Sequence, residues 1–384
     1  MNRIAFKMLV GDRAKYIGIV MGLTFASFLI TQQASIFVGL MTRSYGFISD
    51  LPDVDIWVMD PQVKFIDATK PVQSAYLQRV RSTPGVAWAM PLVKTFMPIR
   101  LESGVLEVAN VIGIDDITLI GGPPVLVQGR LTDLWQADTV IVDELGIQRD
   151  LVAKTSDGQA TPLGVGGFLE INNRRVKVVG ISRSARTFQW QPMIYTTYSR
   201  AISFSPPDSK PLDYILVKAA ANVPAEEVAT RITQQTGLAG YTRDAFERYT
   251  VNYFMNNTGI PINFGISMLL GFIVGTAIAG QTFYNFTLDH LRYFGVLAAM
   301  GLSVRRIMGM VIFQALITGG LGYGLGIGLA CLFGRMVEGT ELAFRMPWPL
   351  LGVSAAAVLL ICVLSAVISM IKVARLEPAS VFRT

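Results

Sequence analysis

Few side chains in this sequence could carry out chemistry. The 384 residues include one histidine, His290, and two cysteines, Cys331 and Cys362. With one histidine and no cysteine cluster, neither a His-based triad nor a His/Cys zinc site is expected. Both cysteines lie in apolar runs, which favours a role as small buried hydrophobes. No Gly-x-x-x-x-Gly-Lys-Ser/Thr sequence occurs, so the chain lacks the loop that binds ATP phosphates. We expect no catalytic, cofactor-binding or metal-binding residue, and no enzymatic activity.

The segment Leu288–Arg306 (LDHLRYFGVLAAMGLSVRR) is the most informative in the chain. Most of it is expected to be helical, with Gly301 ending one helix and Ser303 capping the next. One apolar face has helical spacing and consists of Leu291, Phe294, Leu297 and Ala298. From the residues alone, such an element is either an interfacial helix lying on lipid or a knob that docks onto a cytoplasmic partner.

Small and polar residues mark the apolar segments. Small-x-x-x-small spacing, which allows close helix contact, recurs at Gly18 and Gly22, Gly271 and Gly275, and Gly320, Gly324 and Gly328. These glycines indicate either a seam between two copies or packing within one copy. Three uncharged polar residues indicate interhelical hydrogen bonds or, alternatively, a substrate path: Gln32, Gln33 and Gln281. No charged residue lies at mid-span, which argues against a proton- or sodium-coupled carrier.

The composition indicates which kind of structure holds these residues. The chain is 52% hydrophobic and only 16% charged, against about 25% charged in an average soluble domain, so we expect it to be lodged in lipid. The net charge is +6, but Arg43–Arg248 holds 21 Lys/Arg and 22 Asp/Glu. The positive excess therefore lies beside the apolar segments, which is a topology signal and excludes nucleic-acid binding.

Four apolar stretches are long enough to cross a bilayer as helices. The expected organisation, in chain order, is an amphipathic N-terminal helix (1–15), transmembrane helix 1 (16–42), a large outside domain (43–258), transmembrane helix 2 (259–288), a loop (289–306), transmembrane helix 3 (307–334), a short loop on the outer, periplasmic side (335–345), transmembrane helix 4 (346–371) and a tail (372–384). Lys and Arg cluster in the first segment, the 289–306 loop and the tail, which places both termini in the cytoplasm.

The outside segment is expected to be an α+β domain. Alternating or β-branched runs predict strands at 53–59, 107–114, 139–142, 174–181 and 213–218. Two runs with proline near their first turn predict short helices at 71–82 and 224–235. The fold class expected is therefore an α-helical membrane protein with four transmembrane helices and a large α+β domain inserted between helices 1 and 2.

Motifs along the whole chain resemble one family. Phe294–Ser303 (FGVLAAMGLS) is similar to the signature that follows the second span in MacB-type, FtsX-like ABC permeases, and Arg375–Arg383 (RLEPASVFR) to their closing motif. Val111–Asp115, Gln128–Leu131 and Thr139–Glu144 follow the order of motifs in their outside domain. The LRYFG variant and Gly280–Tyr284 are most similar to the DevC-type branch.

The resemblance implies a permease subunit that transmits the motion of a separate cytoplasmic ATPase to a periplasmic domain (43–258). ATP and Mg²⁺ would then be held by the partner ATPase. The 289–306 segment would be the coupling loop, with ATPase-coupling residues His290, Leu291, Arg292, Tyr293, Phe294, Gly295, Leu297, Met300, Gly301, Arg305 and Arg306. Many members carry an acidic residue before the first glycine of this loop; here Tyr293 and Phe294 stand there, so we expect an aromatic contact.

The resemblance also implies partners and a location. These are a second copy of the chain (a homodimer), a periplasmic adaptor, an outer-membrane channel and membrane lipid. The chain would be a multi-pass protein of the bacterial inner membrane that exports a lipid-like or amphiphilic substrate. Two alternatives stay open: a mechanotransmission permease that regulates a periplasmic cell-wall hydrolase, and a membrane-anchored ligand sensor.

Overall fold

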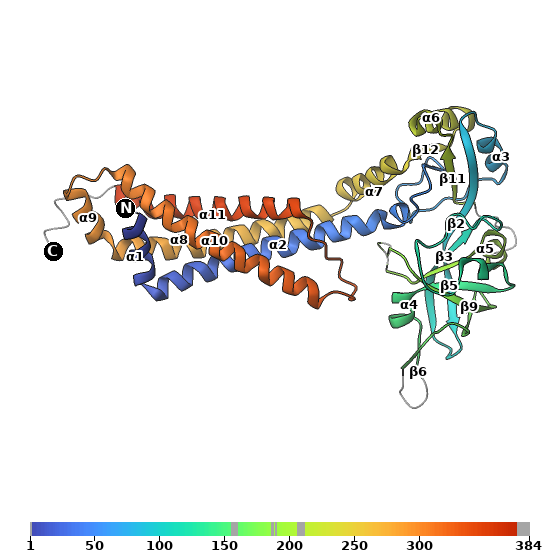
Figure 1. Ribbon diagram of the computed structural model, residues 1–384, viewed down its shortest axis with the longest axis horizontal. Helices are drawn as coiled ribbons and strands as arrows, with labels where there is room; N and C mark the ends of the chain where they lie inside the picture. The colour runs from blue at the N-terminus through green and yellow to red at the C-terminus, as the bar shows by residue number, and fades with distance from the viewer. Residues whose placement is uncertain (1, 155–159, 186–187, 189, 206–211, 375–384) are drawn as a thin grey trace. The chain divides into compact units, whose positions relative to one another are not determined.

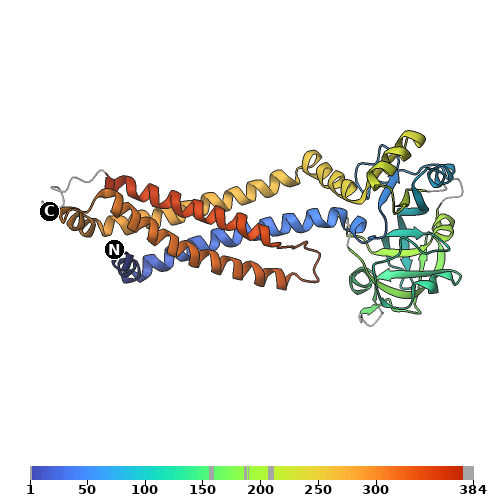
Figure 2. The same cartoon turned by 45° about the horizontal axis from the view of Figure 1, so that its top comes forward.

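The computed structural model describes residues 2–154, 160–185, 188, 190–205 and 212–374 (Figures 1 and 2). The chain divides into two compact units. The first, the membrane unit, combines Met1–Leu40 with Gly259–Thr384, and the second, the outer unit, is Met41–Thr258. The closing motif at 375–383 lies outside the described residues.

Within its described residues, the membrane unit contains four helices that are long and apolar enough to cross a bilayer. They are α2 (Arg13–Ser49), α8 (Ile260–Asp289), α10 (Val304–Met336) and α11 (Trp348–Ala374). Two short helices complete the unit, α1 (Asn2–Gly11) and α9 (Leu291–Ala299). The outer unit is inserted between the first and second of the long helices, so the expected fold class is confirmed.

The outer unit is built on a ten-stranded sheet. Its main path, in spatial order, is β12 (Ala239–Thr242), β1 (Ile56–Met59), β11 (Tyr214–Ala219), β2 (Val86–Leu101), β3 (Leu106–Ile114), β10 (Met193–Thr197), β5 (Thr139–Asp143), β9 (Arg174–Arg183) and β4 (Val125–Gln128). Off this path, β8 (Phe168–Ile171) pairs with β2 and β9. A separate two-stranded sheet contains β6 (Val152–Lys154) and β7 (Ala160–Pro162).

Short helices accompany the strands of the outer unit. They are α3 (Ala75–Arg81), the 3₁₀ helix η1 (Leu131–Trp135), α4 (Glu144–Arg149), α5 (Tyr198–Phe204), α6 (Ala225–Thr236) and α7 (Arg243–Asn257). Gly237 ends α6 in the left-handed conformation at φ 73°, which glycine adopts without steric cost.

Strand β2 holds the outer unit together. Residues up to Leu92 pair with β11, and residues from Val93 onward pair with β3. The β11 side carries the apolar cluster beneath α3 and α6, including Val58, Val217 and Ile232. The β3 side carries a second cluster with β5, β8 and β9. Strand β2 therefore contributes side chains to both of these apolar clusters.

A buried group of charges lies where β2 passes from one half to the other. The ammonium of Lys94 makes an ion pair with Asp67, and both side chains are 1% exposed. The backbone amide of Lys94 donates to Asp213 Oδ2 over 2.8 Å. The ammonium also lies 5.6 Å from the ring centroid of Phe47. Three ionisable side chains thus share one site from which water is excluded, where each charge depends on its partners.

Asp213 is expected to make the stability of the outer unit depend on pH. Burial raises the pKa of its carboxyl from 3.8 to about 6, although the Lys94 amide and the Lys94 charge lower it. The folded state therefore holds this proton more tightly than the unfolded chain does. The stabilisation is complete below about pH 4 and is lost as the pH rises through 6, by about 3 kcal/mol in total.

The substitution Asp213→Asn should flatten this pH dependence, because an amide does not titrate. Urea unfolding of the full chain between about pH 4 and 7, followed by tryptophan fluorescence, measures the slope, since four of the five tryptophans lie in the outer unit. An unchanged slope in the variant would show that another group is responsible.

Candidate functional site

The connection between α8 and α10 forms a short, well-defined element. His290 follows α8, α9 covers Leu291–Ala299, and Gly301 ends the segment at φ 89°. That φ lies in the left-handed region, which glycine adopts readily and other residues rarely. Ser303 then precedes α10 in an extended conformation. Figure 1 shows α9 at the same end of the helix bundle as α1.

The inner face of α9 packs onto the chain's own spans. Phe294 is 1% exposed and lies in the apolar cluster that joins α2, α8, α10 and α11. Leu291 and Leu297 are packed against the same cluster, and Gly295 is buried. This face is therefore covered by the chain's own spans, and Phe294, one of the expected coupling residues, is a core residue of the membrane unit.

The outer face of α9 is an exposed surface with an aromatic residue. Tyr293 is 63% exposed, Val296 42% and Met300 66%. The Tyr293 ring lies 5.8 Å from that of His290, whose Nδ1 is 2.8 Å from the carbonyl oxygen of Phe286. Because a carbonyl only accepts, this contact places a proton on Nδ1. We call Tyr293, Val296 and Met300 the α9 surface.

Basic residues lie close in sequence to the α9 surface. Arg292, Arg305 and Arg306 are all exposed. Large apolar side chains beside arginines are typical of the side chains that contribute most to a protein–protein contact. Of the coupling residues expected from the sequence, the structure therefore places Arg292, Tyr293, Met300, Gly301, Arg305 and Arg306 on the outside, and Phe294 and Gly295 inside.

A charge cluster ties the start of α2 to the end of α8. The ammonium of Lys15 makes ion pairs with Asp289 and, over 3.0 Å, with Asp12. The Lys15 hydrogen bond and charge hold the pKa of the Asp12 carboxyl below its ordinary value. The loop that carries α9 is thereby joined to both the first and the second span.

The N-terminal helix α1 is part of the bundle. The side-chain amide of Gln314 on α10 is fully buried and donates to the carbonyl oxygen of Ala5 over 2.7 Å. Ala5 and Leu9 are fully buried as well, whereas Ile4 and Phe6 are about half exposed. Neither this hydrogen bond nor the Asp289 ion pair was expected; an uncharged polar residue in the third span was the available signal for Gln314.

The glycines of the spans fall into two groups. A Cβ at Gly22 would lie 2.5 Å from Ile278, one at Gly275 would overlap Ala26, and one at Gly271 would lie 3.3 Å from Leu29. These glycines pack α2 against α8, with Gly18 in looser contact. In contrast, Gly320, Gly324 and Gly328 on α10 are exposed and have nothing within 4 Å.

No metal-binding arrangement is found among the residues that the structure describes: no group of three His, Cys, Asp or Glu side chains is placed to hold an ion. Cys362 is buried and Cys331 is exposed. The site is therefore best described as a surface for contact, composed of the α9 surface and the basic residues beside it.

Two family models match this chain. One, described as FtsX-like permease C-terminal, covers residues 253–378, and the other, described as MacB-like periplasmic core domain, covers residues 17–235. A comparison with curated protein sequences gives no significant match.

Solved structures similar to this chain cover about half of it. The periplasmic region of MacB from Actinobacillus actinomycetemcomitans is 16% identical with a TM-score of 0.37, and the match covers 56% of this chain and 96% of that one. The extracellular domain of the noncanonic ABC-type transporter YknZ from Gram-positive bacteria is 12% identical (TM-score 0.33; 49% and 98% covered). A domain of a permease protein from Porphyromonas gingivalis is 15% identical (TM-score 0.33; 51% and 90% covered).

Proposed function

This chain belongs to the MacB/FtsX-like family of ABC transporter permeases, and on that basis we propose that it is the membrane subunit of an exporter driven by a separate cytoplasmic ATPase. The observation that carries the proposal is the α9 surface: an exposed tyrosine on α9 and an exposed methionine directly after it, while the other face of α9 packs onto the spans. The chain hydrolyses no ATP itself; ATP and Mg²⁺ are bound by the partner.

The membrane orientation follows from the basic residues. The N-terminal segment, the α9 segment and the tail carry the Lys and Arg that flank the spans, which places all three in the cytoplasm of a bacterial inner membrane. The ATPase then lies beneath α9. The outer unit lies in the periplasm, where it meets an adaptor that leads to an outer-membrane channel.

Movement of α9 is expected to reach the first two spans together. Phe294 couples α9 to the helix core, and the Lys15–Asp289 ion pair joins α2 to α8 next to it. Closure of the ATPase therefore displaces a set of packed helices and not a single loop, as in other rigid-body transitions. The cargo is a lipid-like or amphiphilic molecule, in line with the DevC-type resemblance of LRYFG and Gly280–Tyr284.

The exposed glycines of α10, Gly320, Gly324 and Gly328, are proposed to form the interface with a second copy of the chain. Gly324→Leu should shift the protein from dimer to monomer, because a large side chain prevents close approach of two helix backbones. Light scattering in detergent measures the change. Gly352→Leu on α11 is the control, since Gly352 is also exposed with nothing within 4 Å. An unaltered dimer in Gly324→Leu would move the seam elsewhere.

Purification of the tagged chain from its native membranes in mild detergent tests the proposal as a whole. We expect an ATPase with a phosphate-binding loop and a periplasmic adaptor to co-purify. Recovery of an ATPase without an adaptor would favour mechanotransmission, and a folded sample with no ATPase at all would refute the proposed role.

A further inference from the structure

We infer that the N-terminal helix α1 binds an anionic phospholipid of the cytoplasmic leaflet, with the lipid phosphate between Arg3 and Lys7. Both side chains are exposed and lie one helical turn apart, which puts their Cβ atoms about 6 Å from each other. The lipid is here a bound partner of the permease and not its cargo. The assignment to the cytoplasmic leaflet rests on the proposed orientation of the chain.

The opposite face of α1 fixes the helix to the spans. Ala5 and Leu9 are fully buried, and the Ala5 carbonyl oxygen accepts the hydrogen bond from Gln314 of α10. Because a helix turns by about 100° per residue, Arg3 and Lys7 point about 160° away from these two buried side chains. The two cations are therefore held on the side of α1 that faces away from the bundle.

The depth of α1 favours lipid over the cytoplasmic ATPase as the occupant of this side. Gln314 lies about 12 Å along α10 from Arg306, the last charged residue before the apolar run of that helix. The 33 residues of α10 extend over about 50 Å, against a hydrocarbon core of about 30 Å, so the first turns of α10 lie among the lipid head groups. Through its bond to Gln314, α1 is held at this level, whereas α9 directly precedes the start of α10.

Apolar side chains beside the cations fit the acyl part of the same lipid. Phe6 and Val10, one turn apart, are 47% and 40% exposed, and Ile4 on the other side of the cations is 50% exposed. Exposed apolar side chains next to basic ones are typical of helices that lie in the membrane interface. A phospholipid supplies the matching pair of groups: a phosphate for the two cations and methylene groups for Phe6 and Val10.

The charges near α1 favour an anionic head group over a zwitterionic one. Arg13, at the start of α2, is a third exposed cation close in sequence. The carboxylate of Asp12 beside it already makes an ion pair with Lys15. Each basic residue near a membrane surface raises the affinity for anionic lipid by about 5-fold, which gives about 30-fold for Arg3 and Lys7 together.

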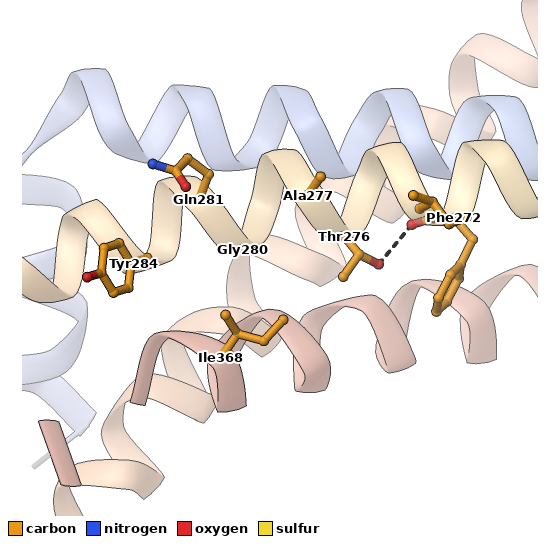
Figure 3. A pocket seen from close by; sticks show the side chains of 8 residues that line it. Phe272, Thr276, Ala277, Gly280, Gln281, Tyr284 and Ile368 are labelled. Atoms are coloured by element: carbon orange, nitrogen blue, oxygen red, sulfur yellow. Dashed lines mark hydrogen bonds between the residues drawn. The ribbon is translucent and has the colours of Figure 1, made fainter. Parts of the chain in front are cut away.

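Photolabelling of the full chain in liposomes, without the ATPase, tests the inference. The probes are a phosphatidylglycerol and a phosphatidylcholine that carry the same photoreactive acyl chain. We expect the peptide that contains α1 to be labelled more strongly by phosphatidylglycerol, by up to about 30-fold. Peptides of α8 that line a groove toward α11, with Phe272, Thr276 and Tyr284 (Figure 3), are the internal reference for contact with bulk lipid.

Three double variants make the labelling specific. Arg3→Gln/Lys7→Gln should remove the preference for phosphatidylglycerol, because an amide carries no charge, and should leave thermal unfolding unchanged, because both side chains are exposed. Arg305→Gln/Arg306→Gln is the matched control: it removes two exposed charges at the start of α10 and should keep the preference. Arg3→Lys/Lys7→Arg should keep it as well, since both charges remain.

Three outcomes would overturn the inference. Equal labelling of the α1 peptide by the two probes, relative to the reference peptides, would mean ordinary contact with bulk lipid. A preference that persists in Arg3→Gln/Lys7→Gln would place the anionic lipid elsewhere. Protection of the α1 peptide when purified ATPase is added would mean that the ATPase covers this side. Because the probes enter both leaflets and the first measurement contains no ATPase, its result depends neither on orientation nor on ATPase docking, which co-purification tests separately.

Discussion

Lys94→Met should destabilise the outer unit by about 3–5 kcal/mol, the usual cost of removing one partner from a buried ion pair. The substitution leaves the buried Asp67 carboxylate without its ion-pair partner and removes the positive charge that lies near Asp213. Loss of the ammonium also removes its contact with the Phe47 ring. Urea unfolding of the full chain, followed by tryptophan fluorescence, measures the difference.

Two further variants make this result specific. Lys70→Met removes a partly exposed ion pair with Asp60, at 3.6 Å, and should cost less than about 1 kcal/mol. The double variant Lys94→Met/Asp67→Leu should recover part of the stability, because no unpaired charge is left at that position. If Lys94→Met lowers the free energy of unfolding no more than Lys70→Met does, the buried charge cluster does not stabilise the outer unit as proposed.

Tyr293→Ala together with Met300→Ala should weaken binding of the ATPase without unfolding the permease. Both side chains are about two-thirds exposed, and a central contact residue contributes about 2 kcal/mol or more, which is about 30-fold in affinity. Binding of the purified ATPase to the permease in nanodiscs measures this. Trp348→Ala is the control, because that aromatic side chain is 83% exposed and lies at the start of α11.

Phe294→Ala should instead lower the stability of the membrane unit, because this side chain is buried and does not lie on the α9 surface. Deleting a phenylalanine that is 1% exposed leaves a cavity in the cluster that joins α2, α8, α10 and α11, and should cost about 3–5 kcal/mol of bundle stability. We therefore expect a lower unfolding temperature in this variant. Weakened ATPase binding in Phe294→Ala, with unchanged stability and normal binding in the Tyr293/Met300 variant, would contradict the assignment of the two faces.

The four spans could be predicted because apolar length alone decides them. The outer boundary of the first could not: α2 continues past residue 42 to Ser49, since Arg43 and Ser44 end the apolar run but are compatible with a helix. In the outer unit, strands with alternating residues, such as β3 and β9, were expected close to where they lie. Strand β2 was missed because Pro91, Lys94 and Pro98 interrupt its pattern.

The faces of α9 illustrate a second limit of the sequence. Helical spacing identified Leu291, Phe294 and Leu297 as one apolar face, and the structure keeps them together. The sequence pattern cannot tell what covers that face, because lipid, a partner protein and the chain's own spans all accept apolar side chains. Similarly, Gln281 was recognisable as a polar residue in a span, but only the packing of α8 on α11 places it beside a groove.

Strand β1 has a consequence for synthesis. Among the described residues it pairs only with β11 and β12. Trp57 therefore cannot pair until Leu216 and Tyr241 have been synthesised. At ribosomal rates of about 5–20 residues per second, the interval between these segments is on the order of ten seconds. During that interval Ile56–Met59 has neither of its two partner strands, so we expect this segment to be accessible to proteases. A nascent outer unit therefore needs protection, because its first strand is among the last to be paired.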